Sequence, residues 1–406
     1  MTKLQQRLFW LLVFLLPVQF GRHFWPEWSY VMGLRIDYLS PTIYLTDILM
    51  VAILGLWGLE KWRMENGEWR ITVKNLRKLI FPVSIFVFLL VNSFLAQNQG
   101  AALYKFAKII EFSLLGLYVA KNNYTLYAIC HTLPLAIIYS SLIAVTQFLK
   151  QASLGGVFWW LGERTFNAGT PGIAKAIVNG QLIMRPYATF PHPNVLAGFV
   201  LVSLMLIGVR RQVSGVRRFL YWLAIVLGIV AILISFSRSA WVVGLLIGLW
   251  LVRKKPLLFT VYCLLSTVGV IAWLAPYFST DEAFFQRLQL IKTAWLMIQT
   301  TPLVGVGLNN FIVRLPDFWQ MTGFTYWLQP VHNIFLLIMA ETGLVGLLIF
   351  LWFLFLTYKK LSIIHYPLSI ALSAILALGL FDHYWLTLQQ SQLLFAIILG
   401  LAWAKK

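Results

Sequence analysis

Twelve apolar stretches of 13 to 26 residues, separated by polar segments, run through the 406-residue chain. An apolar helix of about 20 residues crosses the roughly 30 Å hydrocarbon core of a bilayer. Hydrophobic residues make up 60% of the sequence, against about 45–50% in a soluble domain, so a water-soluble globule is excluded. We expect one all-α domain over 1–406, a polytopic membrane protein with about 12 transmembrane helices. The predicted spans are 8–20, 42–59, 79–96, 101–120, 125–149, 194–209, 219–236, 239–252, 256–275, 332–357, 366–380 and 388–404.

The basic residues are distributed unevenly between the two sides of these spans. Lys and Arg outnumber Asp and Glu by 32 to 13, which gives a net charge of +19. If the N-terminus is cytoplasmic, the inner segments hold 20 basic and three acidic residues, and the outer segments ten and seven. This is the positive-inside bias of membrane proteins. It predicts that both termini are cytoplasmic and that the chain meets membrane lipid, with no nucleic acid as partner.

Two long outer connections, 150–193 and 276–331, stand out from the others. Long connections in a compact protein are usually functional. The second contains an apolar stripe at helical spacing, made of Phe284, Leu288, Ile291, Trp295 and Ile298. We predict an amphipathic helix over 281–299 that lies in the outer interface of the membrane. A thirteenth span is the alternative, disfavoured by the charges of Asp281, Glu282 and Arg287.

The first long connection contains a turn signal. Asn179-Gly180 lies between two short apolar runs, Ile173–Val178 and Gln181–Met184. Asn-Gly is favoured in two-residue turns between strands. The sequence predicts either a small hairpin that ends near Arg185 or a plain loop.

Two arginines and a histidine are expected at the depth of the outer leaflet. The span that follows Arg238 has only 14 residues, a helical rise of about 21 Å, which places Arg238 below the outer headgroups. Arg185 precedes the sixth span in a proline-rich segment, and His332 begins the tenth. Each residue alone has a structural explanation. Arg238 would reach a lipid phosphate or pair with an acid, Arg185 would be an ordinary loop arginine, and His332 would hydrogen-bond to the start of a helix. Together they suit a diphosphate anion with a proton acceptor beside it.

Other polar groups in or near the spans have simpler explanations. Glu341 lies nine residues after His332, on the opposite face of a helix, and is expected to be buried against another helix where Gly343 and Gly346 allow close packing. Lys108 and Glu111 are one turn apart and are expected to neutralise each other, with a proton or ion path as the alternative.

The outer segments contain few ligands for a metal ion. They hold seven acids, of which only Asp281 and Glu282 are adjacent, and no Asp-x-Asp. Asp382-His383, between the last two spans, is expected to be a solvated loop, or else to rim the site. An octahedral magnesium site needs several oxygen ligands, so we expect no metal and no other cofactor. Arginine must then stabilise the negative charge of the diphosphate.

Four segments follow one another in a specific order. They are Arg185-Pro-Tyr-Ala-Thr-Phe-Pro-His-Pro-Asn194, Ser237-Arg238-Ser-Ala-Trp241, Pro302-Leu-Val-Gly305-Val-Gly307-Leu-Asn-Asn-Phe311, and His332-Asn-Ile-Phe-Leu336 with Glu341-Thr-Gly343-Leu-Val-Gly346. In this order they resemble the O-antigen ligase and polymerase family. The resemblance spans about 185–350, whereas the first five spans and the last two match only in topology.

The resemblance implies a bacterial membrane glycosyltransferase of the GT-C type. Such enzymes move a glycan from undecaprenyl diphosphate to an acceptor hydroxyl on the outer side of the cytoplasmic (inner) membrane. On the matching positions, Arg185 and Arg238 would bind the leaving diphosphate and His332 would orient or deprotonate the hydroxyl, with inversion in one displacement. Further residues expected to support the site are His192, Asn194, Asn333, Arg314 and Glu341.

Three branches of this family share the motifs: ligases that complete lipopolysaccharide, polymerases of surface polysaccharide, and enzymes that glycosylate proteins. The acceptor is accordingly a glycan, a lipid or a protein. The connection 276–331 holds no soluble domain typical of a protein acceptor, so we expect a ligase or a polymerase ahead of protein glycosylation.

A transporter or flippase for lipid-linked oligosaccharide is the alternative of a different class. Such a protein predicts internal repeats and a charged site near the middle of the membrane. The halves of this sequence show no convincing repeat, and its distinctive charges gather at the outer face. The enzyme is therefore favoured.

Overall fold

The computed structural model describes residues 2–64, 73–178, 180–208, 214–253, 282–319, 327–361 and 366–404. In these residues helices predominate, and strands form only three two-stranded sheets. The helices are α1 (Lys3–Phe14), α2 (Leu45–Met64), α3 (Val73–Leu95), α4 (Gln99–Lys121), α5 (Tyr124–Lys150), α6 (Pro193–Ile207), α7 (Val216–Ile234), α8 (Arg238–Val252), α10 (Glu282–Thr300), α11 (Phe311–Phe318), α12 (Ile334–Lys360), α13 (Tyr366–Gly379), α14 (Tyr384–Thr387) and α15 (Gln389–Ala402), with short 3-10 helices at Glu27–Ser29 and Gly156–Leu161.

Every predicted span except 256–275, which lies outside the described residues, overlaps a helix. Among the described helices, α5, α7 and α12 are long and apolar enough to cross a membrane, while α6, α8, α13 and α15 are apolar but shorter. The prediction of an all-α protein of the membrane type is supported, and the number of twelve spans stays a prediction.

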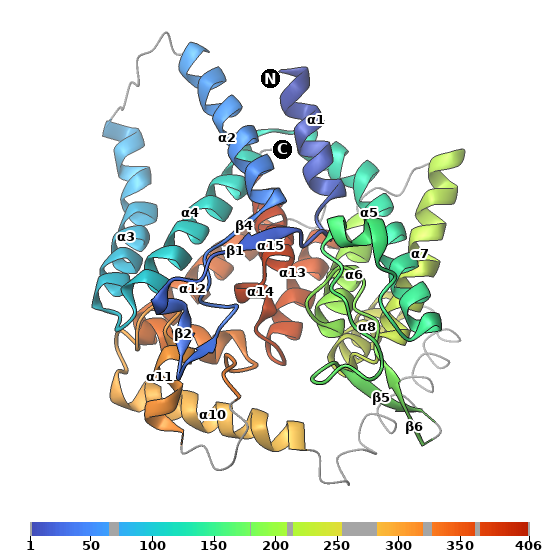
Figure 1. The fold of residues 1–406 in the computed structure, drawn as a ribbon. Helices are drawn as coiled ribbons and strands as arrows, with labels where there is room; N and C mark the ends of the chain where they lie inside the picture. The colour runs from blue at the N-terminus through green and yellow to red at the C-terminus, as the bar shows by residue number, and fades with distance from the viewer. Residues whose placement is uncertain are drawn as a thin grey trace.

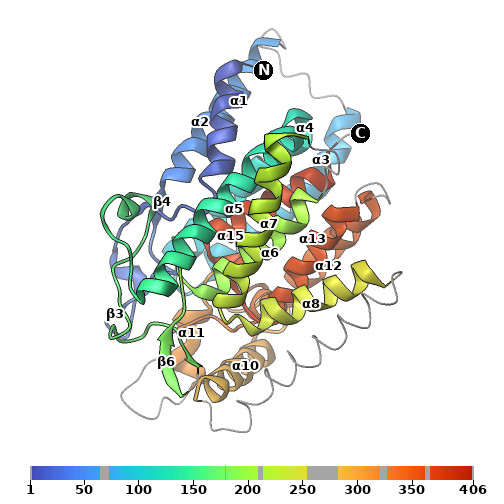
Figure 2. The same ribbon diagram turned by 90° about the vertical axis from the view of Figure 1, so that its right-hand side faces the viewer.

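The two chain ends lie on the same side of the helical bundle, and α10 runs across the opposite end (Figures 1 and 2). Helix α10 thus lies away from the chain ends, and the sides of a membrane that they face stay a prediction.

Helix α6 lies in the centre of the bundle, where 13 of its 15 residues are buried. A helix that is apolar on all sides packs on all sides, and α6 contacts α5, α7, α8, α13 and α15. Its approach to α14 depends on Gly198, because a Cβ there would lie 2.1 Å from the Tyr384 hydroxyl oxygen. This packing fixes the first turn of α6, which begins at the candidate site.

Three short antiparallel sheets lie between helices. Two of them, between α1 and α2, were not predicted from the sequence. In these, β1 (Gly21–His23) pairs with β4 (Thr42–Tyr44), and β2 (Tyr30–Val31) with β3 (Leu34–Arg35). The third sheet is the hairpin expected around Asn179-Gly180, with β5 (Lys175–Val178) paired to β6 (Gln181–Met184). Of the two alternatives for this segment, the hairpin is confirmed, although Asn179 itself lies outside the described residues.

Helix α12 is interrupted at Gly343, where the backbone is left-handed with φ at 67°. The interruption frees backbone groups for the loop that precedes α11. Val306 N donates to the Ala340 carbonyl and Leu344 N to the Pro302 carbonyl, each at 2.8 Å. Irregular backbone at membrane depth is tolerated where protein satisfies its polar groups, so the third and fourth sequence motifs form one packed unit.

Alanine at position 343 is expected to destabilise this unit. A Cβ on Gly343 would lie 2.2 Å from the Leu303 carbonyl carbon, and its backbone conformation, with φ 67° and ψ −170°, costs a residue other than glycine about 1–3 kcal/mol. We expect Gly343→Ala to lower the thermal unfolding midpoint of the detergent-solubilised protein by several degrees. Gly55→Ala is the control, because no described atom lies within 4 Å of a Cβ there. Equal midpoints for the two variants would contradict this account.

Candidate active site

Arg185 begins a chain of polar contacts that leads into the site. Its Nε donates to the Ser235 carbonyl and its Nη2 to Asn194 Oδ1, both at 2.6 Å. Asn194, in the first turn of α6, in turn donates from Nδ2 to Asp382 Oδ2 at 3.2 Å. The guanidinium is thus held by two acceptors, and Asn194 connects it to the carboxylate.

Asp382 lies between two histidines. A carboxylate oxygen of Asp382 and one ring nitrogen each of His332 and His383 all lie within 4.8 Å of one another. The two imidazole rings meet edge to face, with centroids 5.1 Å apart. Burial raises the pKa of the Asp382 carboxyl, but the neighbouring histidines and Arg287 lower it by more, to about 2. Asp382 is therefore a buried carboxylate at neutral pH.

His332 lies just before α12 and has no part in capping that helix. Asn333 is the cap, since its Oδ1 accepts from the backbone N of Phe335 and Leu336 at 2.9 and 3.0 Å. Within the described residues, Nδ1 of His332 is buried without a hydrogen-bond partner. Burial lowers the pKa of His332, an effect that the charge of Asp382 opposes. The neutral imidazole is thus favoured and can accept a proton.

Three arginines contribute positive charge to the site. Burial lowers the pKa of the Arg185 guanidinium to about 10, and the charges of Arg287 and Arg238 act in the same direction. The charge of Arg287 also lowers the pKa of His332 and that of Asp382. Arg238 is the first residue of α8, directly after its N-cap Ser237. Guanidinium groups form bidentate contacts with phosphate, so this end of the bundle is suited to a phosphorylated anion.

Helix α10 brings Arg287 to the site, and it occupies the segment where the amphipathic helix was predicted. Among the described side chains, its buried face coincides with the predicted stripe only at Ile298, which is 4% exposed. Leu290, Ala294 and Met297 are at most 1% exposed, and α10 packs on α11 and α12. Trp295, from the predicted stripe, is 53% exposed. The helix therefore has two apolar faces, one against protein and one exposed, as an interfacial helix requires.

The structure brings some of the expected supporting residues together and places others elsewhere. His192 is the N-cap of α6 and accepts from Asn194 N at 3.1 Å. Its pKa falls to about 3 because of burial and the charge of Arg185. His192 and Asn194 thus belong to the site, whereas Asn333 caps α12 with its oxygen and donates from Nδ2 to the Leu380 carbonyl.

Arg314 and Glu341 make other contacts. Arg314 forms an ion pair with Asp317 on α11 at 3.1 Å and donates to Gln97 Oε1. Glu341 is buried in α12, where its side chain accepts from Phe311 N at 3.4 Å. Glu341 is thus buried against the start of another helix, α11, as expected.

Arg287 was not predicted as a site residue, and Asp382-His383 was expected to be a solvated loop or else to rim the site. Asp382 and His383 are 7% and 3% exposed, so the solvated loop was wrong for both, and the alternative agrees with their position beside His332. The backbone N of His383 donates to Asp382 Oδ1 at 2.8 Å, and its Nδ1 lies 2.8 Å from the Thr387 hydroxyl. An adjacent acid and histidine between two outer span ends was the available signal.

The cluster of Asp382, His332 and His383 offers nitrogen and oxygen atoms that metals also bind. Both carboxylate oxygens of Asp382 already accept hydrogen bonds, from His383 N and Asn194 Nδ2. The three arginines add positive charge nearby, so the arrangement favours an anion over a metal ion.

Comparison with known protein families supports the resemblance seen in the motifs. Residues 223–351 match the family model described as O-antigen ligase. This range includes Arg238, Arg287 and His332, whereas Arg185 and Asp382 lie outside it. A search of curated proteins gave no match to the chain.

Proposed function

The chain carries an O-antigen ligase domain, and we propose that it moves a glycan from undecaprenyl diphosphate to an acceptor hydroxyl at the outer face of the bacterial cytoplasmic membrane. The observation that carries this proposal is the gathering of histidines around Asp382, with arginines whose charges act on the same groups. The family match supports the proposal that the protein is a membrane glycosyltransferase. The arginines of the site support the proposal that the donor carries a diphosphate.

The donor diphosphate would lie against Arg185, Arg238 and Arg287. Arg185 is held by Ser235 and Asn194, so its guanidinium is oriented before the ligand binds. Electrostatic groups that are already in place cost no reorganisation when charge develops on the leaving group. The exposed apolar face of α10 would lie against the lipid of the donor.

The reaction is a single displacement at the anomeric carbon. The acceptor oxygen forms a bond to that carbon as the bond to the diphosphate oxygen breaks, and the diphosphate leaves with the electron pair. His332 takes the hydroxyl proton, and the nearby carboxylate of Asp382 stabilises the resulting imidazolium. The anomeric configuration is inverted.

We expect this reaction to be independent of metal ions. The arginines supply the positive charge that a divalent cation would otherwise supply, so EDTA should leave the initial rate of transfer in proteoliposomes unchanged. A metal-dependent glycosyltransferase in the same vesicles is the control and should lose its activity. A loss of transfer that added Mg²⁺ or Zn²⁺ restores would instead assign Asp382 and the two histidines to a metal.

Deletion of the gene in the native host tests the function. A ligase mutant should accumulate lipid-linked chains of full length that are not attached to their acceptor, whereas a polymerase mutant should carry chains of a single repeat. The purified protein should form a new glycosidic bond from a polyprenyl-diphosphate donor. If it moved the donor across the vesicle membrane without forming that bond, the flippase alternative would replace the enzyme.

A further inference from the structure

A cavity of about 220 Å³ lies beside the candidate site. Its walls come from the segment between α1 and α2, from α4, and from the chain around α14 and α15. Arg164 and Pro191, from the connection before α6, and Asn309, from the loop before α11, complete the lining. The lining includes Gln19, Asp37, Tyr38, Tyr44, Tyr104 and Gln392. Pockets for drug-sized ligands measure about 300–1,000 Å³, so this cavity suits a smaller group, the size of one sugar ring.

The cavity is connected to the proposed catalytic histidine through His383. The ring of Tyr38, which lines the cavity, meets the ring of His383 edge to face with centroids 5.4 Å apart. Thr387 also lines the cavity, and its hydroxyl lies 2.8 Å from His383 Nδ1. The ring of His383 in turn contacts that of His332. A group in the cavity would therefore lie one side chain away from the proposed site of reaction.

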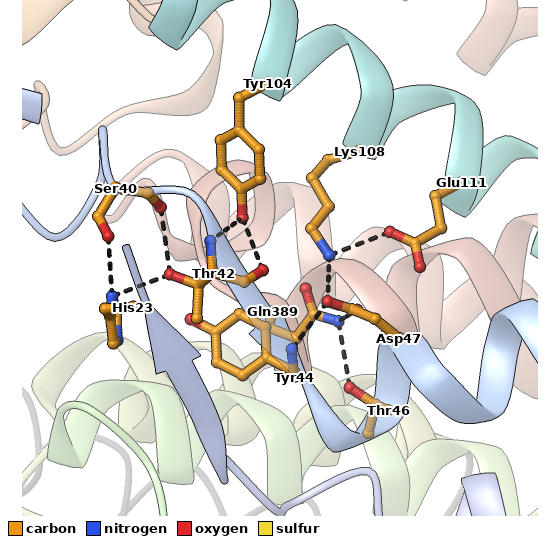
Figure 3. Close-up of polar contacts among 10 residues, drawn as sticks. All are labelled: His23, Ser40, Thr42, Tyr44, Thr46, Asp47, Tyr104, Lys108, Glu111 and Gln389. Atoms are coloured by element: carbon orange, nitrogen blue, oxygen red, sulfur yellow. Dashed lines mark hydrogen bonds and ion pairs between the residues drawn. The ribbon is translucent and has the colours of Figure 1, made fainter. Parts of the chain in front are cut away.

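The cavity wall carries charges of both signs. The Nζ of Lys108 lies 2.5 Å from Asp47 and 3.0 Å from Glu111, as Figure 3 shows. Lys105 and Arg164 donate to the carbonyls of Leu386 and Pro191, and the third acid is Asp37, which is exposed. Because these three basic and three acidic side chains balance in charge, an added ion would meet no net opposite charge.

The remaining lining is suited to hydroxyl groups. Tyr44 and Tyr104 offer aromatic surface, on which the apolar face of a sugar ring can pack. Within the described residues, Oε1 of Gln19 is buried without a hydrogen-bond partner, and an unsatisfied buried acceptor costs about 1–3 kcal/mol. Asp37 is exposed and can accept two further hydrogen bonds. These groups would accept hydrogen bonds from sugar hydroxyls.

We propose that this cavity binds a neutral sugar ring of the glycan acceptor, and that the part of the acceptor outside the cavity brings the attacking hydroxyl to His332. The inference rests on the glycosyl transfer proposed above. Arg185, Arg238 and Arg287, which would hold the donor diphosphate, do not line the cavity. The acceptor and the donor would therefore be bound by different residues.

The test measures acceptor binding and transfer separately. The probe is the acceptor glycolipid purified from the deletion strain, and the variants are Gln19→Ala and Asp37→Ala in the full-length protein. By calorimetry without donor, we expect each variant to bind the acceptor at least tenfold more weakly. In transfer assays we expect a matching rise in KM for the acceptor, with KM for the donor and kcat at saturating acceptor unchanged. Gln97→Ala and Asp317→Ala are matched controls, because Gln97 and Asp317 contact Arg314 outside the cavity.

Equal acceptor affinity in the Gln19 and Asp37 variants, or a rise in KM for the donor alone, would overturn the cavity proposal. So would a parental protein that binds no acceptor. A parental protein that binds the acceptor through Gln19 and Asp37 but transfers no glycan would support the cavity and refute the proposed reaction, so the two failures are distinguishable.

Discussion

Alanine in place of His332 is expected to lower kcat for glycan transfer by about 10²–10⁴-fold, the usual contribution of general acid–base catalysis. The imidazole lies beside the Asp382 carboxylate, and its Nδ1 has no partner among the described residues. Asn333 performs the capping role that a histidine at a helix start often has, so the substitution should leave α12 intact. The measurement is the initial rate with a purified polyprenyl-diphosphate donor in proteoliposomes.

A matched variant and a pH profile separate catalysis from folding. His131→Ala is the control, because His131 lies on α5 and bonds to the Tyr127 carbonyl. Burial lowers the pKa of His332 below its usual 6.5, because a buried charge is disfavoured. The rate should therefore fall as pH drops through that lowered pKa, with a midpoint below 6.5, and the variant should lack this acid limb. A folded His332→Ala protein that transfers glycan at the parental rate would remove the imidazole from the mechanism.

The helices were predictable because apolar runs are a local property of the sequence. The Asn-Gly signal was enough to suggest the β5-β6 hairpin. Helix ends were less predictable, since α1 ends at Phe14, inside the apolar run that predicted a span over 8–20, and α3 begins at Val73 rather than at 79. The sheets between α1 and α2 were not predicted because their strands have only two or three residues, too few for an alternating pattern to appear.

The candidate site was only partly predictable because its contacts join distant parts of the chain. Asn194 and Asp382 are 188 residues apart, and nothing local distinguishes a buried Asp-His pair from a solvated one. In the sequence Arg287 counted only as a charge that disfavours a thirteenth span. The helix that carries it has a second apolar face, at Leu290, Ala294 and Met297, which packs on the protein. That face turns Arg287 toward the site, and only the tertiary packing shows it.

Lysine in place of Arg185 is expected to lower kcat/KM for the lipid-linked donor at least tenfold, which corresponds to about 1.4 kcal/mol of transition-state stabilisation. Lysine keeps the charge but has a single ammonium, which cannot reproduce the planar fork of donors. The guanidinium bonds Ser235 with one nitrogen and Asn194 with another. A lysine would lose at least one of these bonds and the defined orientation toward the diphosphate. Asn194 would then hold the Asp382 carboxylate less firmly.

A lysine variant of a second arginine, Arg238, tests whether the loss of activity comes from the site or from a folding defect. Arg238 is the first residue of α8, and its charge lowers the pKa of Arg185, so Arg238→Lys should also lower kcat/KM tenfold or more. The unfolding midpoint of each variant, measured beside the rate, identifies a folding defect. Arg35→Lys is the control, since Arg35 lies on β3 and donates to the Tyr30 hydroxyl at 3.3 Å. The rate at low donor concentration should fall in both site variants and remain parental in Arg35→Lys. If Arg185→Lys and Arg238→Lys both turned over the donor at the parental rate, neither guanidinium would bind the diphosphate in the transition state.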